Sequence, residues 1–169
     1  MKPSAHFGFT LIELIFVIVI IGVLTAVAVP KFKSLTDNAK ISSELATASS
    51  VQSALDAVHG EWITNTCTFK WGNGQDSSTA SSDFNTTGYP TADELKDGND
   101  PFGKLFKTKT TDWVLLTPCP NGSTNICYRG PASDPDKGAK PKSPVNLNKP
   151  AKNDFWEYNV TAGTFNLTR

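Results

Sequence analysis

The most prominent pattern in the sequence is an unbroken apolar run close to the N-terminus. Residues 9–29 contain a single charged residue, Glu13. At about 1.5 Å per residue, a helix of this length reaches roughly 30 Å, the thickness of the hydrocarbon core of a bilayer. Many of its residues are β-branched, but a segment in lipid must satisfy its own backbone hydrogen bonds. The pattern therefore predicts a membrane-spanning helix over residues 9–30.

The next segment has apolar residues at every third or fourth position. No Gly or Pro lies between residues 31 and 59. The apolar positions are Ile41, Leu45, Ala48, Val51, Leu55, Val58 and Trp62, and the other faces carry Lys40, Glu44, Gln52, Asp56 and Glu61. This predicts an amphipathic helix over residues 31–62 that packs on a domain, with Gly60 favouring its end. Two interpretations of Pro30 stay open, because it can lie inside one continuous helix or begin a second one.

Residues 63–169 are predicted to form a globular head with antiparallel strands near the C-terminus. Strands are expected at residues 113–117, 126–129, 155–160 and 164–167, and a short one is possible around Cys67, Phe69 and Trp71. Trp156, Tyr158 and Val160 share one face, which we expect to meet the amphipathic helix. Residues 131–153 contain five prolines and are expected to form an irregular loop. One amphipathic helix with three or four strands gives an α+β fold.

Composition argues against an enzyme and against a nucleic-acid-binding protein. Lys+Arg and Asp+Glu number 16 each, so there is no overall charge to attract nucleic acid. His6 and His59 are the two histidines, which leaves His59 alone for any catalytic triad and argues against a multi-histidine metal site. The acidic segment 93–100 lacks EF-hand spacing and reads as a solvated turn. We therefore predict no catalytic site, no cofactor and no metal, with calcium binding left open.

The three cysteines are either unrelated buried thiols or include one disulfide pair. Cys119 and Cys127 are separated by a short loop between two strand-like runs, so a disulfide between them is sterically reasonable. An exported domain would favour its oxidation. Cys67 is then a free thiol or an alternative partner.

Glu13 distinguishes the apolar run from an ordinary signal peptide. The signal-peptide alternative would use Lys2 as the charged region and residues 26–28 as an A-x-A cleavage site. The run is longer than the usual apolar region of about 7–15 residues. An acid near mid-membrane also costs about 2.5–3.5 kcal/mol on insertion scales, and a discarded peptide has no use for it. The carboxylate is therefore a functional group that needs a partner.

The stretch Gly8-Phe9-Thr10-Leu11-Ile12-Glu13, followed by the apolar run and Pro30, resembles the N-terminus of type IV prepilins and type II secretion pseudopilins. The resemblance implies a leader of residues 1–8, cleavage between Gly8 and Phe9 by prepilin peptidase, and N-methylation of Phe9. It also implies that Glu13 compensates the amino group of Phe9 in a neighbouring subunit. The physics agrees, because opposite charges attract strongly at short range in a low dielectric.

Gly22 and Pro30 bracket a stretch of the membrane helix that can loosen when subunits pack. Pro30 removes one backbone hydrogen bond and Gly22 weakens the turn before it. We count both, with Glu13, as assembly residues.

The resemblance predicts a structural subunit that polymerises at the inner membrane into a type II secretion pseudopilus or a type IV pilus. Its implied partners are other pilin-like subunits, prepilin peptidase, the inner-membrane assembly platform and membrane lipid, with a periplasmic head and a filament in the periplasm or at the cell surface. Lys31 and Lys33 follow the span while only Lys2 precedes it, against the positive-inside rule, so this orientation rests on the resemblance.

Beside an exported enzyme that would work through His59, two alternatives stay open. One is a DNA-uptake or adhesive minor pilin that uses the lysines of residues 131–153, although that loop lacks the aromatic residues that stack on single strands. The other is a membrane-anchored periplasmic binding domain that never polymerises.

Overall fold

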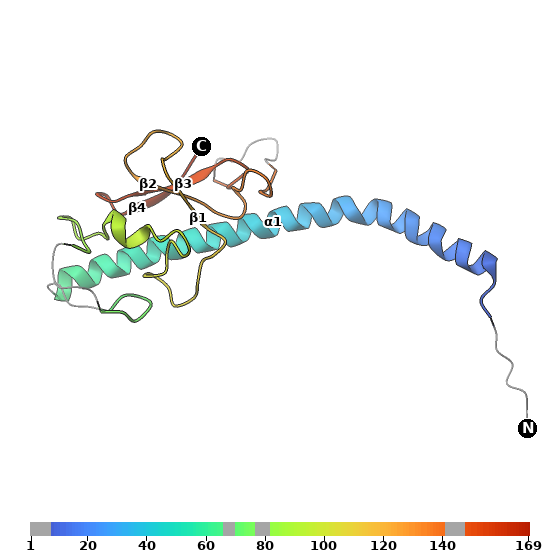
Figure 1. The fold of residues 1–169 in the computed structure, drawn as a ribbon, viewed down its shortest axis with the longest axis horizontal. Helices are drawn as coiled ribbons and strands as arrows, with labels where there is room; N and C mark the ends of the chain where they lie inside the picture. The colour runs from blue at the N-terminus through green and yellow to red at the C-terminus, as the bar shows by residue number, and fades with distance from the viewer. Residues whose placement is uncertain (1–7, 66–69, 77–81, 141–147) are drawn as a thin grey trace, which may run out of the picture. The chain divides into compact units, whose positions relative to one another are not determined.

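The computed structural model describes residues 8–65, 70–76, 82–140 and 148–169. In chain order it contains helix α1 (Leu11–Asn65), the short 3₁₀ helix η1 (Ala92–Leu95), and strands β1 (Val114–Leu116), β2 (Ile126–Arg129), β3 (Phe155–Asn159) and β4 (Thr164–Thr168), as Figure 1 shows. The chain divides into two compact units, one ending at Thr36 and one spanning Asp37–Arg169. The predicted α+β class, a long N-terminal helix with a small antiparallel sheet, is confirmed.

Helix α1 is continuous and includes Pro30. Of the two interpretations of Pro30, the structure has the single helix, in which Pro30 cannot donate a hydrogen bond to the carbonyl of Ala26. The expected end at Gly60 is wrong, because the helix continues to Asn65. A glycine in a helix interior costs only about 1 kcal/mol, and the half-buried Trp62 packs against the core one half-turn later.

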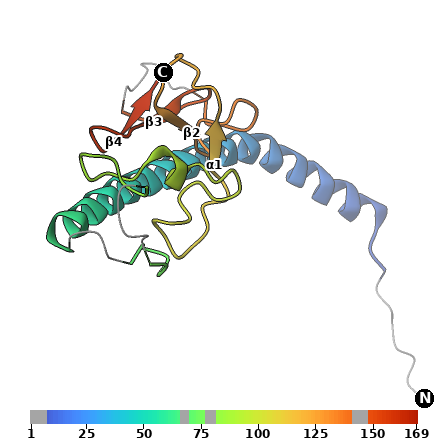
Figure 2. The same cartoon turned by 60° about the vertical axis from the view of Figure 1, so that its left-hand side comes forward.

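The four strands form one antiparallel sheet in the order β1-β2-β3-β4. Each strand pairs with the next along the chain, and the registers include Val114↔Arg129, Ile126↔Tyr158 and Phe155↔Thr168. Figures 1 and 2 show the sheet alongside the part of α1 that belongs to the same unit. The sheet therefore has one face toward the helix and one face away from it.

The main core lies between α1 and the inner face of the sheet. It joins Ala48, Val51, Leu55 and Val58 of the helix to Ile126, Tyr128, Trp156, Tyr158 and Phe165 of the strands. The expectation that Trp156 and Tyr158 face the helix is confirmed, and Val160 packs against the same core. A second, smaller cluster of Cys119, Cys127 and Phe155 lies on the opposite face, as the two-residue period of a strand requires.

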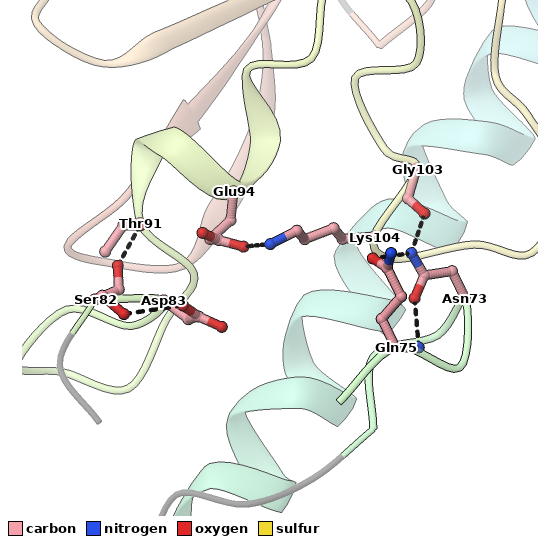
Figure 3. Close-up of polar contacts among 8 residues, drawn as sticks. All are labelled: Asn73, Gln75, Ser82, Asp83, Thr91, Glu94, Gly103 and Lys104. Carbon is pink, nitrogen blue, oxygen red and sulfur yellow. Dashed lines mark hydrogen bonds and ion pairs between the residues drawn. The ribbon is translucent and has the colours of Figure 1, made fainter. Parts of the chain in front are cut away.

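Side-chain contacts hold the long connection between α1 and β1 (Figure 3). Asn73 donates from Nδ2 to the carbonyl oxygen of Gly103 at 2.9 Å, and Lys104 forms an ion pair with Glu94 of η1. Nearby, Phe102 is fully buried in the core. This connection is therefore fastened at several points to the rest of the unit.

The proline-rich segment has no helix or strand among its described residues, as expected, but part of it is buried. Ala132, Ser133 and Ala139 are completely buried, and the backbone N–H of Ala139 donates to the carbonyl of Ala132 at 2.8 Å. Lys152 in turn donates its N–H to the carbonyl of Ala139 at 2.9 Å. We call residues 130–140 and 148–154 the packed loop. Residues 141–147 lie outside the described residues, as do residues 66–69 with Cys67 and most of the short strand expected there.

Candidate functional site

The N-terminal part of α1 presents apolar side chains to its surroundings over its whole length. Phe9 is 90% exposed, and every large apolar side chain from Leu11 to Val29 is exposed. By length and composition this helix can cross a membrane. An apolar surface of this extent marks a segment that contacts lipid or other protein chains.

Glu13 is held at the start of this helix by Thr10. The carboxylate oxygen Oε2 accepts hydrogen bonds from the Thr10 backbone N–H and from Thr10 Oγ1, both at 2.9 Å. The backbone N–H of Glu13 donates to Thr10 Oγ1 at 3.3 Å. These reciprocal bonds form a capping box, which satisfies free N–H groups at the helix start. The T-x-x-E signal for this capping box is present in the sequence at Thr10–Glu13, although no expectation stated above rests on it.

Gly8 and Phe9 precede the helix. Both are exposed, and a Cβ atom added at Gly8 would meet no atom within 4 Å. Packing in the described residues therefore gives no reason for a glycine at this position. While residues 1–8 are attached, the nitrogen of Phe9 is an uncharged amide.

Gly22 and Pro30 both lie inside α1. A Cβ atom at Gly22 would also meet nothing within 4 Å, so its small size serves no contact among the described residues. Between them, Thr25 Oγ1 donates to the carbonyl of Ile21 at 2.7 Å. Such bonds from a side chain to the backbone four residues earlier often bend helices.

Cys119 and Cys127 are linked by a disulfide, with their Cα atoms 5.4 Å apart. The loop that it closes is fastened to β3 through Glu157. Asn125 donates from Nδ2 to Glu157 Oε1 at 2.8 Å, and Asn121 donates from Nδ2 to Oε2 at 3.2 Å. Hydrogen bonds from the Ser123 and Asn125 side chains hold the pKa of Glu157 below its usual value. We call residues 119–127 the disulfide loop.

Glu44 of α1 is a residue whose predicted position is wrong. We assigned it to a polar face, but it is fully buried. Its Oε2 accepts the backbone N–H groups of Ala132 at 2.6 Å and Ser133 at 3.0 Å, and its Oε1 accepts from Trp156 Nε1 at 2.7 Å and from Ser133 Oγ. A Cβ atom at Gly130 would lie 2.5 Å from the carboxyl carbon. Glu44 therefore fixes the packed loop and β3 to the helix.

The spacing of Glu44 from Ile41 and Ala48 indicates that Glu44 is buried. Residue 44 is three positions after Ile41 and four before Ala48, so the helical period already placed it along the buried stripe. The charged residue type favoured a polar face for Glu44, because a buried carboxylate is rare unless it is paired or hydrogen-bonded.

His59 packs against residues near the C-terminal end of α1. Its ring stacks on that of Tyr89 with 4.2 Å between centroids, and Nδ1 lies 3.1 Å from the carbonyl oxygen of Gly88. Within residues 8–65, 70–76, 82–140 and 148–169, no three His, Cys, Asp or Glu side chains gather closely enough to hold a metal ion.

Comparisons with known proteins agree with these features. Residues 3–29 match the family described as the prokaryotic N-terminal methylation motif. The type IV narrow pilus major component PilA5 of Thermus thermophilus is 41% identical over 112 residues, which cover 64% of this chain and 96% of that protein. A fimbrial protein of Neisseria meningitidis serogroup A is 44% identical over 61 residues, or 34% of this chain and 36% of that protein. The type IV major pilin protein PilE1 of Neisseria gonorrhoeae is 43% identical over 61 residues, 34% of this chain and 37% of that protein. No solved structure matches significantly.

The similarity to PilA5 covers nearly the whole of that protein, so it extends well beyond the N-terminal motif. The long apolar helix and the small antiparallel sheet are consistent with the same assignment. The chain belongs to the type IV pilin family, whose members are structural subunits that polymerise with one another into filaments and are not enzymes.

Proposed function

We propose that this chain is a subunit of a type IV pilus, released from its leader between Gly8 and Phe9, N-methylated at Phe9 and polymerised at the inner membrane. The observation that carries the proposal is the Gly8–Glu13 motif placed directly at the start of an exposed apolar helix that begins at Leu11. The relatives at 41–44% identity are described as pilus, fimbrial and pilin proteins, which supports a pilus over a type II secretion pseudopilus.

Cleavage after Gly8 is the first step of this proposal. Gly8 lies in exposed chain before the helix, where a peptidase can reach the backbone, and nothing in its described surroundings requires a glycine. We therefore assign its small size to the prepilin peptidase. Gly8→Val should leave a membrane-inserted precursor that keeps residues 1–8, as an immunoblot of the membrane fraction would detect. Gly22→Ala, a substitution at a second glycine with open surroundings, should be cleaved normally.

Glu13 acts in the second step, when subunits join. Cleavage converts the nitrogen of Phe9 into a charged amine four residues before Glu13. In lipid, an isolated charge of either sign is costly, so the carboxylate of one subunit and the amine of its neighbour stabilise each other. Before assembly, the capping box with Thr10 supplies Glu13 with two hydrogen bonds. The capping box thereby lowers the cost of keeping this acid in the membrane until a neighbour arrives.

Glu13→Ala tests this step. The variant should insert and be cleaved like the wild type, but should be depleted from sheared filaments, because its register with the neighbouring amine is lost. The measurement compares a membrane-fraction immunoblot with a sheared-filament preparation from the same cells. A wild-type yield of filaments from Glu13→Ala as the only subunit would refute charge compensation.

Gly22 and Pro30 serve the same assembly step. Pro30 leaves the carbonyl of Ala26 without its usual helix bond, and Gly22 is a poor helix former. We propose that the turns between them loosen when subunits pack against each other. The peptidase, the assembly platform and membrane lipid are the partners that this pathway requires, and the head lies on the periplasmic side of the inner membrane before assembly.

A further inference from the structure

Strand β4 (Thr164–Thr168) forms one edge of the sheet, because the strand order is β1-β2-β3-β4. An edge strand presents unpaired backbone N–H and C=O groups to which a strand from another chain can pair. Proteins commonly block such pairing with charged residues, proline or bulges. The five residues of β4, Thr164-Phe165-Asn166-Leu167-Thr168, include no charge and no proline.

Gln52 of helix α1 occupies the N-terminal end of this edge with its side-chain amide. Its Oε1 accepts the backbone N–H of Phe165 at 2.8 Å, and its Nε2 donates to the carbonyl of Gly163 at 3.1 Å. In a parallel sheet, one residue of a neighbouring strand bonds to the same pair of groups on its partner, the C=O of residue i−1 and the N–H of residue i+1. The amide of Gln52 thus takes the place that one residue of a fifth strand would occupy beside Thr164.

Asp56, one turn further along α1, fixes which way this amide points. The second hydrogen on Gln52 Nε2 is donated to Asp56 Oδ1 at 2.9 Å. With the nitrogen held between Asp56 and Gly163, the oxygen must face the N–H of Phe165. Both hydrogens and the carbonyl oxygen of the amide are therefore used, so these three contacts fix its orientation.

We propose that Gln52 is an edge guard, whose amide substitutes for a neighbouring strand and prevents β4 of a second copy from adding to the sheet. Blocking the β4 edge matters in this family, because filament assembly brings many copies of the chain together. Strand pairing between the open, uncharged edges of two copies would then compete with the contacts that build the filament. The guard acts through the orientation of one amide and does not depend on the processing or charge compensation of Phe9 and Glu13.

Gln52→Glu is the most specific test, because it keeps the shape of the side chain and changes its donor group into an acceptor. One oxygen of the introduced carboxylate would face the carbonyl of Gly163 and the carboxylate of Asp56. This repulsion should move the side chain away from the strand and release the N–H of Phe165. The matched control is Ser53→Ala, next along the helix, since Ser53 is exposed and donates to the carbonyl of Ser49 on its own helix.

The experiment uses the full chain in detergent micelles, with amide hydrogen exchange at Phe165 and a photo-crosslinking residue at the exposed Asn166. At neutral pH, Gln52→Glu should raise exchange at Phe165 by about two- to tenfold, the range set by one net hydrogen bond, and should produce β4–β4 crosslinks. Ser53→Ala should match the wild type. Acidification that protonates the introduced carboxyl should restore protection, since a protonated carboxyl can donate again to Gly163.

Unchanged exchange and crosslinking in Gln52→Glu at neutral pH would overturn the proposal. So would unprotected exchange of the Phe165 amide in the wild type, a measurement that needs no variant. If Gln52→Glu does not fold, Gln52→Met removes both bonds with an apolar side chain of similar length. It should give the same β4–β4 crosslinks, and their absence in a folded Gln52→Met chain would equally contradict the guard.

Discussion

At the scale of single residues, polar side chains of α1 do more than solvate its outer face. Glu44 bonds to the packed loop and to Trp156 of β3, and Gln52 bonds to the edge of β4. The two residues are eight positions apart, or roughly 12 Å along a helix. They attach the helix to the sheet at two separate points, and this adds directional contacts to a core that is otherwise apolar.

Replacing Glu44 should be strongly destabilising. Glu44→Ala leaves two backbone N–H groups, the Ser133 hydroxyl and the Trp156 indole without their buried acceptor. Each buried donor without a partner costs about 1–3 kcal/mol, so we expect a loss of roughly 2–4 kcal/mol after partial relaxation. Urea unfolding of the full chain in micelles, followed by tryptophan fluorescence, measures it. Ser53→Ala should change stability by less than about 0.5 kcal/mol, and an equal effect of the two substitutions would contradict the buried network.

Tyr128 and Tyr158 should make the fold sensitive to alkali. Their hydroxyls donate to the carbonyls of Leu95 at 2.6 Å and Pro90 at 2.9 Å, and burial raises the pKa of both above the usual value of 10.0. The unfolded chain therefore ionises first as the pH rises. Stability is intact below pH 10.0 and falls as the pH passes above it. Thermal unfolding between pH 8 and 11 should show a smaller alkaline loss for Tyr158→Phe than for the wild type.

At the scale of elements, the sequence predicted the helix and the strands to within a few residues, because their apolar periods of 3.6 and 2 are strong. All four expected strands form, with β3 ending one residue before the expected Val160. The packed loop could not be predicted, since its order depends on a hydrogen-bond acceptor supplied by Glu44, 88 positions earlier than Ala132. Gly60 failed as a stop signal because tertiary packing of Trp62 outweighs helix propensity.

The candidate assembly residues were identified from a local motif, whereas the contacts of Glu44 and Gln52 needed the fold. Gly8, Phe9 and Glu13 are recognisable because they stand together at the start of an apolar run. The capping box between Thr10 and Glu13 was also readable from spacing alone. Long-range hydrogen bonds such as those from Gln52 to Gly163 leave no comparable pattern in the sequence.

The contribution of the disulfide loop to the free energy of unfolding can be measured separately. A cross-link between Cys119 and Cys127 closes a short loop, for which chain entropy gives a stabilisation of about 2–3 kcal/mol. The Cys119→Ser/Cys127→Ser double variant should lose this amount in urea unfolding. Non-reducing peptide mapping of the wild type provides the check on connectivity, and a bond from Cys67 to either cysteine would contradict the assignment.

Glu157, which is bonded to the disulfide loop, should make the stability of the fold depend on pH in the acidic range. Hydrogen bonds lower its folded pKa from the model-compound value of 4.5, so the stability that it contributes is present above that pH. It is lost as the pH falls from 4.5 toward the lower folded value. Between pH 6 and pH 3 the wild type should therefore lose more stability than Glu157→Gln. A steeper loss in Glu157→Gln would contradict the role of these bonds.

At the scale of the whole molecule, the chain combines two surfaces of opposite kind. One is a helix segment whose apolar side chains are exposed from Leu11 to Val29, and the other is a head that buries its apolar residues between α1 and the sheet. A segment of the first kind is stable only in lipid or against other chains. Membership of the type IV pilin family accounts for both, since its subunits pass from a membrane into a polymer.

The most direct test of this account is the intact mass of the subunit recovered from sheared filaments of cells that express this chain. The account predicts a chain that begins at Phe9, carries one methyl group on its N-terminal nitrogen and retains the Cys119–Cys127 bond. A filament subunit that still contains residues 1–8, or recovery of the chain from membranes but never from filaments, would contradict it.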